Sequence, residues 1–130
     1  MQSWTWKSIA ASVIAMFTAA LGGWDALAQA MIACIALDVV AGLIRAGAEC
    51  KLNSSVMRKG LYRKGAYFVA VLLAVLLDRS LFHAAPACRT LVISYIIVNE
   101  SLSILEHLAA LGVPIPEQVK DMLLKIREKQ

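Results

Sequence analysis

Long apolar runs that are almost free of charge constrain this chain most strongly. The first extends from Ser8 to Trp24 without a charged residue, and others cover residues 26–48, 61–83 and 90–111. A helix of about 17 to 23 residues, at 1.5 Å per residue, is long enough to cross the hydrocarbon core of a membrane. Hydrophobic residues make up 60% of the 130-residue chain, and a soluble domain of this size would leave many of them exposed. The sequence therefore predicts one all-α membrane domain, residues 1–130, with about four transmembrane helices at 8–24, 26–48, 61–83 and 90–111.

The first two runs form a hairpin in this interpretation. Gly22 and Gly23 break the helix, and Asp25 can cap the next one. Lys7 and the apolar run after it also resemble a secretory signal, with residues 26–28 as its cleavage site. We favour the hairpin, in which the first run is retained as a span.

A short amphipathic helix follows the last run. From Glu117 onward, Val119, Met122 and Ile126 fall on one helical face and charged residues on the other. We expect a cytoplasmic helix over about residues 116–128 that lies on the membrane surface.

Small residues recur at intervals of four, a spacing that lets helices approach closely in lipid. These faces predict helix–helix contacts within or between copies of the chain. We assign to helix packing Ala11, Ala15, Ala19, Gly23, Gly42, Ala66, Ala70 and Ala74.

The basic residues indicate how the chain is oriented. Of the 13 Lys and Arg residues, all but Arg79 and Arg89 fall on one side of a four-span topology. Cytoplasmic loops carry the excess of positive charge, so we expect both termini and the central loop in the cytoplasm. The basic stretches border apolar segments and lack interleaved aromatic residues, which favours anionic lipid over nucleic acid as a partner.

Asp38 lies near the middle of the second run, where a charge costs about 2.5–3.5 kcal/mol on insertion scales. Arg45 lies two turns away and would reach it only with help from water or a neighbouring helix. Two interpretations stay open: a hydrogen-bonded Asp that holds helices together, and a residue with a role in a pore or gate.

Polar residues form a broad stripe along the fourth run. Such a stripe can line water in an oligomeric pore, pack on polar groups of other helices, or lie at the membrane interface. The stripe comprises Tyr95, Asn99, Glu100, Ser103, Glu106 and His107.

No arrangement of residues indicates catalysis, so we expect no enzyme, no metal site and no cofactor. Ser54 and Ser55 have no histidine partner in their sequence context and suit the cap of a helix that begins near Val56. His83 and His107 lack metal-ligand spacing. The three cysteines are widely spaced and odd in number, which indicates packing residues.

Several of these features together resemble the phage-lysis and toxin-secretion holins, small bacterial membrane pore formers, over about residues 37–124. One departure is His107, where the family pattern has Asn or a similar residue. The matching stretches are Leu37-Asp38 with Gly42, the loop and turn residues Lys51, Leu52, Asn53, Ser54, Ser55, Gly60, Leu61 and Lys64, the run from Asn99 to Glu106, and Gly112, Val113, Pro114, Ile115 and Pro116.

The resemblance implies a multi-pass homo-oligomer in the bacterial cytoplasmic membrane. Such an assembly opens lesions for an endolysin or a large toxin, which passes as cargo without stable binding, and an antiholin is a further partner. Two alternatives remain: a small ion-coupled transporter, since intramembrane acids also mark ion pathways, and a holin antagonist that shares the fold but never opens.

Overall fold

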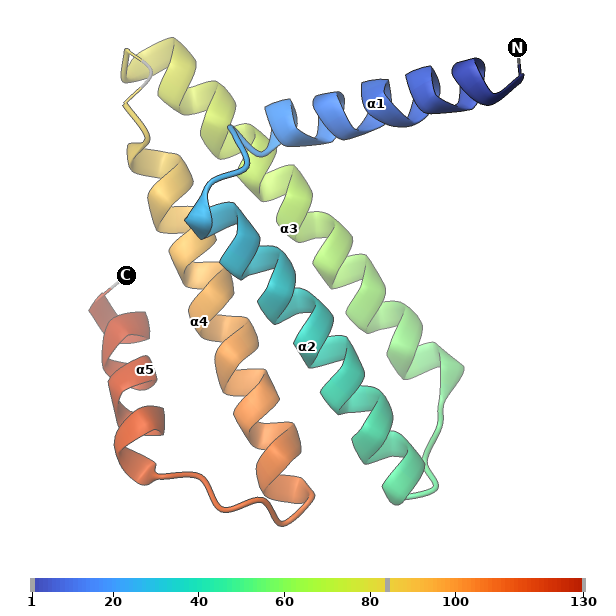
Figure 1. Ribbon diagram of the computed structural model, residues 1–130. Coiled ribbons are helices and arrows are strands. Elements are labelled where there is room, and N and C mark those ends of the chain that lie inside the picture. The colour runs from blue at the N-terminus through green and yellow to red at the C-terminus, as the bar shows by residue number, and fades with distance from the viewer. Residues whose placement is uncertain (1, 84, 130) are drawn as a thin grey trace.

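Five helices account for most of the described chain (Figure 1). The computed structural model describes residues 2–83 and 85–129, and no strand occurs in these two ranges. The all-α class predicted from the sequence is therefore confirmed. The helices are α1 (Gln2–Ala20), α2 (Ala26–Ala48), α3 (Ser54–Leu81), α4 (Ala87–Ala110) and α5 (Glu117–Lys129).

Helices α2, α3 and α4 form a bundle in which α4 is the common partner. It packs against both α2 and α3, whereas α2 and α3 make little direct backbone contact with each other. Figure 1 shows α2 and α4 running in the same direction and α3 in the opposite one. The first residues of α2 and α4 therefore lie at one end of the bundle, with the last residues of α3.

A small apolar core joins the three helices near that end, and most other large apolar side chains face outward. Helices α2, α3 and α4 are each long and apolar enough to cross a membrane. Lipid is the solvent that such outward faces require. The core comprises Leu21, Ala28, Met31, Val71, Val75, Ile93 and Ile96.

The fourth span predicted at residues 8–24 is not confirmed, because α1 is not among the helices that meet these criteria within the described residues. Helix α1 begins with polar residues and projects away from the bundle across its long axis (Figure 1). Residues 3–17 are all exposed. The end of α1 contacts α3, with the Phe17 ring centroid 5.4 Å from that of Phe68. The small residues Ala11, Ala15 and Ala19 thus have no neighbour within the chain that buries them.

Helix α3 begins earlier than the predicted span at 61–83. The Asn53 side chain caps it by accepting hydrogen bonds from the backbone N–H and the hydroxyl of Ser55, at 3.0 and 2.8 Å. Ser54 and Ser55 therefore form the first turn of a helix that the sequence analysis placed near Val56. Gly60, predicted as a loop and turn residue, lies inside this helix, as does Lys64, which belonged both to that motif and to the predicted span.

The remaining boundaries stay close to the apolar runs. Helix α2 covers the residues of the second run, and Asp25 accepts a hydrogen bond from the backbone N–H of Ala28 at 3.0 Å. Helix α4 starts directly after Pro86, and Gly112 follows its end with a φ of +83°, a conformation that favours glycine. After Pro114 and Pro116, α5 turns back beside α4 (Figure 1).

Candidate functional site

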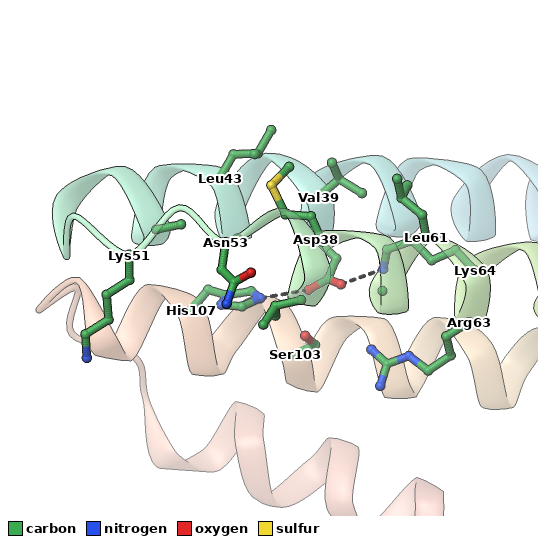
Figure 2. Close-up of a pocket in the computed structure, with 15 residues that line it drawn as sticks. Asp38, Val39, Leu43, Lys51, Asn53, Leu61, Arg63, Lys64, Ser103 and His107 are labelled. Atoms are coloured by element: carbon green, nitrogen blue, oxygen red, sulfur yellow. Dashed lines mark hydrogen bonds and ion pairs between the residues drawn. The ribbon is translucent and has the colours of Figure 1, made fainter.

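Three charged side chains, one from each helix of the bundle, meet inside it. Nζ of Lys64 on α3 donates to Oδ2 of Asp38 on α2 at 2.7 Å and to Oε2 of Glu100 on α4 at 2.6 Å. The relative exposures of the three residues are 7%, 5% and 0%. We call Asp38, Lys64 and Glu100 the charge triad; Figure 2 shows its Asp38 and Lys64 contact.

The triad links α2 to α3, two helices that make little direct contact, and joins both to α4. Because α2 and α3 have few direct contacts, the Lys64 side chain is their main polar link through Asp38. A buried charge is tolerated only when it is paired and hydrogen-bonded, and removal of one partner leaves the other as an unpaired buried charge. The position of each helix therefore depends on the other two.

Glu100 has partners for both of its carboxylate oxygens. The Tyr67 hydroxyl donates to Oε1 at 2.9 Å, and Nδ2 of Asn99 donates to the same hydroxyl oxygen at 2.8 Å. Oε2 is the atom held by Lys64. This chain of hydrogen bonds adds a second link between α3 and α4.

Asp38 is less completely paired. Its Oδ1 is buried and has no hydrogen-bond partner among the described residues, although Nε2 of His107 lies 3.4 Å away (Figure 2). Nη1 of Arg45 lies 3.4 Å from Nδ1 of the same ring. Arginine can only donate, so Nδ1 is the acceptor and the Nε2 proton faces Asp38. The triad itself contains two carboxylate groups and one ammonium group.

The cation that contacts Asp38 differs from the one considered from the sequence. Arg45 was the cation considered there, but Lys64 contacts the carboxylate directly. Arg45 instead forms a pair with Glu49 at 3.3 Å and reaches Asp38 only through His107.

A second network lies at the other end of the bundle, around buried Arg89. Two of its guanidinium nitrogens each lie 2.8 Å from a different carboxylate oxygen of Asp25, and Nε donates to the carbonyl of Leu21 at 2.5 Å. The Arg89 hydrogen bonds hold the pKa of Asp25 well below its usual range. Asp78 accepts the backbone N–H groups of Cys88 and Arg89 at 2.8 and 2.9 Å, which caps α4. This network fixes the turn between α1 and α2 to the start of α4.

The predicted polar stripe of α4 is divided between two faces. Asn99, Glu100, Ser103 and His107 turn toward the bundle, whereas Tyr95 and Glu106 are exposed. The packing residues are divided as well, because Ala74 is buried while Ala66 is exposed and Ala70 half-buried. An added Cβ at Gly42 would lie 3.4 Å from the His107 ring, an ordinary contact distance, so α2 and α4 lie close together at this point.

Sequence reasoning missed the ionic role of Lys64, the hydrogen bonds of Tyr67 and the network around Arg89. A usable signal existed for Lys64: two uncompensated acids on apolar runs require a cation, and Lys64 is the last basic residue before an apolar stretch of α3. Across the described part of the chain, no group of three or more His, Cys, Asp or Glu side chains is placed to hold a metal ion.

Comparison with known proteins gives the family. The family model for the bacteriophage holin family matches residues 15–128. An uncharacterized 14.9 kDa protein of the nagH 3′ region of Clostridium perfringens is 39% identical over 88% of this chain and 87% of its own length. YqxH of Bacillus subtilis is 38% identical over 72% and 66%. A protein of Bacillus phage phi105 named "Probable holin" is 34% identical over 67% and 64%. No solved structure matches. The chain is therefore a membrane protein that belongs to the bacteriophage holin family.

Proposed function

We propose that this chain is an oligomeric lesion former of the bacterial cytoplasmic membrane that lets an endolysin or a large protein cargo leave the cell. The observation that carries the proposal is the charge triad: three ionic groups stay closed off inside a bundle whose outer faces are apolar. Such a bundle is compatible with lipid while closed, and it holds the polar groups that a water-filled lesion requires.

In the closed state the polar groups satisfy one another, except for Oδ1 of Asp38. Lys64 neutralises one carboxylate charge, and Tyr67 and Asn99 complete the pairing of Glu100. Separation of the helices in lipid would expose charges that cost about 2.5–3.5 kcal/mol each on insertion scales. Separation beside water carries no such cost, because water hydrates the same groups.

In this proposal, the polar groups of the triad reach water when copies of the chain accumulate in the membrane. The exposed small-residue face of α1, with Ala11, Ala15 and Ala19, lets copies pack closely. Beyond a critical density the bundles would rearrange so that triad residues from several copies line one lesion. Cargo passes without stable binding, and an antiholin would act by blocking the rearrangement.

The basic end of the bundle faces the cytoplasm in our proposal. The loop between α2 and α3 and the end of α4 lie at the same end, since Arg45 contacts His107. With α2, α3 and α4 as the spans, the C-terminal end of α1 joins the bundle at its outer end. Insertion of α1 as a fourth span would bring the N-terminus to the cytoplasm. Protease accessibility of an N-terminal tag in spheroplasts distinguishes three spans, with the N-terminus outside, from four spans, with the N-terminus in the cytoplasm.

The test of function is expression of the chain in a bacterium together with a cytoplasmic endolysin. We expect membrane potential to collapse abruptly after a lag, with simultaneous escape of the endolysin. An intact potential at high expression would contradict lesion formation and favour the antagonist. Saturable uptake of one solute in vesicles, without leakage, would favour an ion-coupled transporter.

A further inference from the structure

A cavity of about 360 Å³ opens between α2 and α3 at the basic end of the bundle (Figure 2). Its walls carry Val39 and Leu43 from α2 and Met57 and Leu61 from α3. Pockets for small molecules measure roughly 300–1,000 Å³ and are mostly apolar. The cavity therefore has the size and lining of a binding site for an apolar group.

The walls continue onto the outer faces of the two helices. Leu43 and Leu61 are exposed, and α2 and α3 are the pair that make little contact with each other. In a membrane, this opening would face the hydrocarbon chains of lipid. Gly60 also lines the cavity, and an added Cβ there meets nothing within 4 Å.

The rim of the cavity is basic. Lys51 and Arg63 line it, and both belong to a stretch, residues 51–64, that also contains Arg58 and Lys59 and no acidic residue. Figure 2 shows Lys51 beside the turn that precedes α3 and Arg63 farther along that helix. A cation would be repelled from this rim, and an anion would be attracted.

The inner end of the cavity is polar as well. Asp38, Lys64, Ser103 and His107 lie there, and the buried Oδ1 of Asp38 has no hydrogen-bond partner among the described residues. A hydrocarbon chain at this end would leave that oxygen unsatisfied. An apolar occupant therefore suits the outer part of the cavity, between the walls of α2 and α3.

We propose that the cavity binds one anionic phospholipid, with part of an acyl chain between α2 and α3 and the phosphate beside Lys51, at the loop end of the rim. The apolar walls select a hydrocarbon chain, the basic rim selects a negative headgroup, and the sideways opening admits a molecule already in the bilayer. The proposal requires a membrane location but does not depend on lesion formation.

The experiment uses the full chain purified in mild detergent and measures lipid retention by native mass spectrometry. Phosphatidylglycerol and phosphatidylcholine with the same acyl chains are added at equal concentration. We expect one phosphatidylglycerol to be retained at least tenfold more strongly than phosphatidylcholine. Equal retention of the two lipids would overturn the headgroup assignment.

Two glycine variants test the cavity itself. Gly60→Leu fills it, whereas Gly65→Leu makes the same change on α3 at a position that does not line it and is equally free of neighbours within 4 Å. Circular dichroism checks that both variants keep their helices. Retention of phosphatidylglycerol should fall at least tenfold in Gly60→Leu and stay unchanged in Gly65→Leu. Equal retention of phosphatidylglycerol by both variants would contradict the proposed lipid site.

The rim is tested by Lys51→Gln, a change at an exposed position that leaves the buried core intact. The preference for phosphatidylglycerol should disappear while some retention of either lipid persists. Inorganic phosphate separates a lipid from a free anion as the ligand. Thermal stabilisation by phosphate equal to that by phosphatidylglycerol would overturn the lipid proposal. Loss of self-association in Gly60→Leu without loss of lipid would also overturn it, because that result would indicate that a second copy of the chain occupies the cavity.

Discussion

Replacement of Lys64 by methionine should destabilise the bundle strongly, because it leaves two buried carboxylates without their cation. The Lys64 ammonium lies 2.7 Å from Asp38 and 2.6 Å from Glu100, and the three residues are at most 7% exposed. Removal of one partner from a buried ionic group costs about 3–5 kcal/mol. For a chain of this size that corresponds to a fall in Tm of about 12–20 °C.

Thermal unfolding of the purified protein in detergent, followed by far-UV circular dichroism, measures this effect. Lys59→Met is the matched control, since Lys59 is exposed on the same helix and its loss should change Tm little. A combined variant with Lys64→Met, Asp38→Asn and Glu100→Gln removes all three charges. It should recover part of the loss, because no buried charge is then left without a counter-charge.

The Tm values of these variants test the ionic role of Lys64. Similar Tm values for Lys64→Met and Lys59→Met would mean that Lys64 does not hold the bundle together. Failure of the combined variant to recover stability would mean that the loss of Tm in Lys64→Met comes from lost packing rather than from unpaired buried carboxylates. In cells, the same weakening should bring depolarisation forward in Lys64→Met relative to Lys59→Met.

Three further predictions concern the hydrogen-bond networks. Gly22→Ala should lower Tm more than Gly112→Ala. Both glycines have a φ near +80°, but only at Gly22 would the added Cβ lie 2.7 Å from Nε of Arg89. Equal losses of Tm in the two variants would contradict this prediction. Tyr67→Phe should cost about 1.5–3 kcal/mol of unfolding free energy through the lost bond to a buried carboxylate, and an unchanged Tm would refute it. Arg89 lowers the pKa of Asp25 from its ordinary value of 3.8, so the pair stabilises the fold fully above about pH 5 and less as the pH falls through the folded-state pKa. Asp25→Asn should therefore lower Tm at pH 7 and progressively less below pH 4, and a pH-independent loss would count against the pair.

The parts of the fold that were predictable are those fixed by local pattern. The second apolar run became α2 because its length and hydropathy suffice, and Asp25 at its start supplies a cap within three residues. Gly112 and the prolines after it ended α4 for similarly local reasons. Each of these features can be read from a short stretch of chain.

The start of α3 was less predictable because two local signals conflict. Residues 54–63 are rich in charge and polar atoms, so hydropathy alone places the span later, at 61. Helix formation depends instead on the cap that Asn53 provides. The polar first turns can extend beyond the apolar part, where their long basic side chains reach water.

The charge triad was only half predictable. Asp38 and Glu100 stand out as acids on apolar runs, but Lys64 was counted with the loop because it lies close to other basic residues in the sequence. Its partners are 26 and 36 residues away, and only the packing of three helices brings them together. The position of α1 has the same origin, since its uncharged run resembles a span while its ring contact with the bundle lies near its C-terminal end.

Release of markers of graded size from lipid vesicles that contain the purified chain tests the central proposal most directly. Protein density is the variable, and a folded enzyme of endolysin size is the largest marker. Formation of oligomeric lesions predicts that the enzyme stays inside at low density and escapes steeply above a threshold, at a lower threshold for Lys64→Met than for Lys59→Met. Retention of the enzyme at every density, or escape of small ions alone in linear proportion to protein, would contradict the proposal that this family member opens lesions.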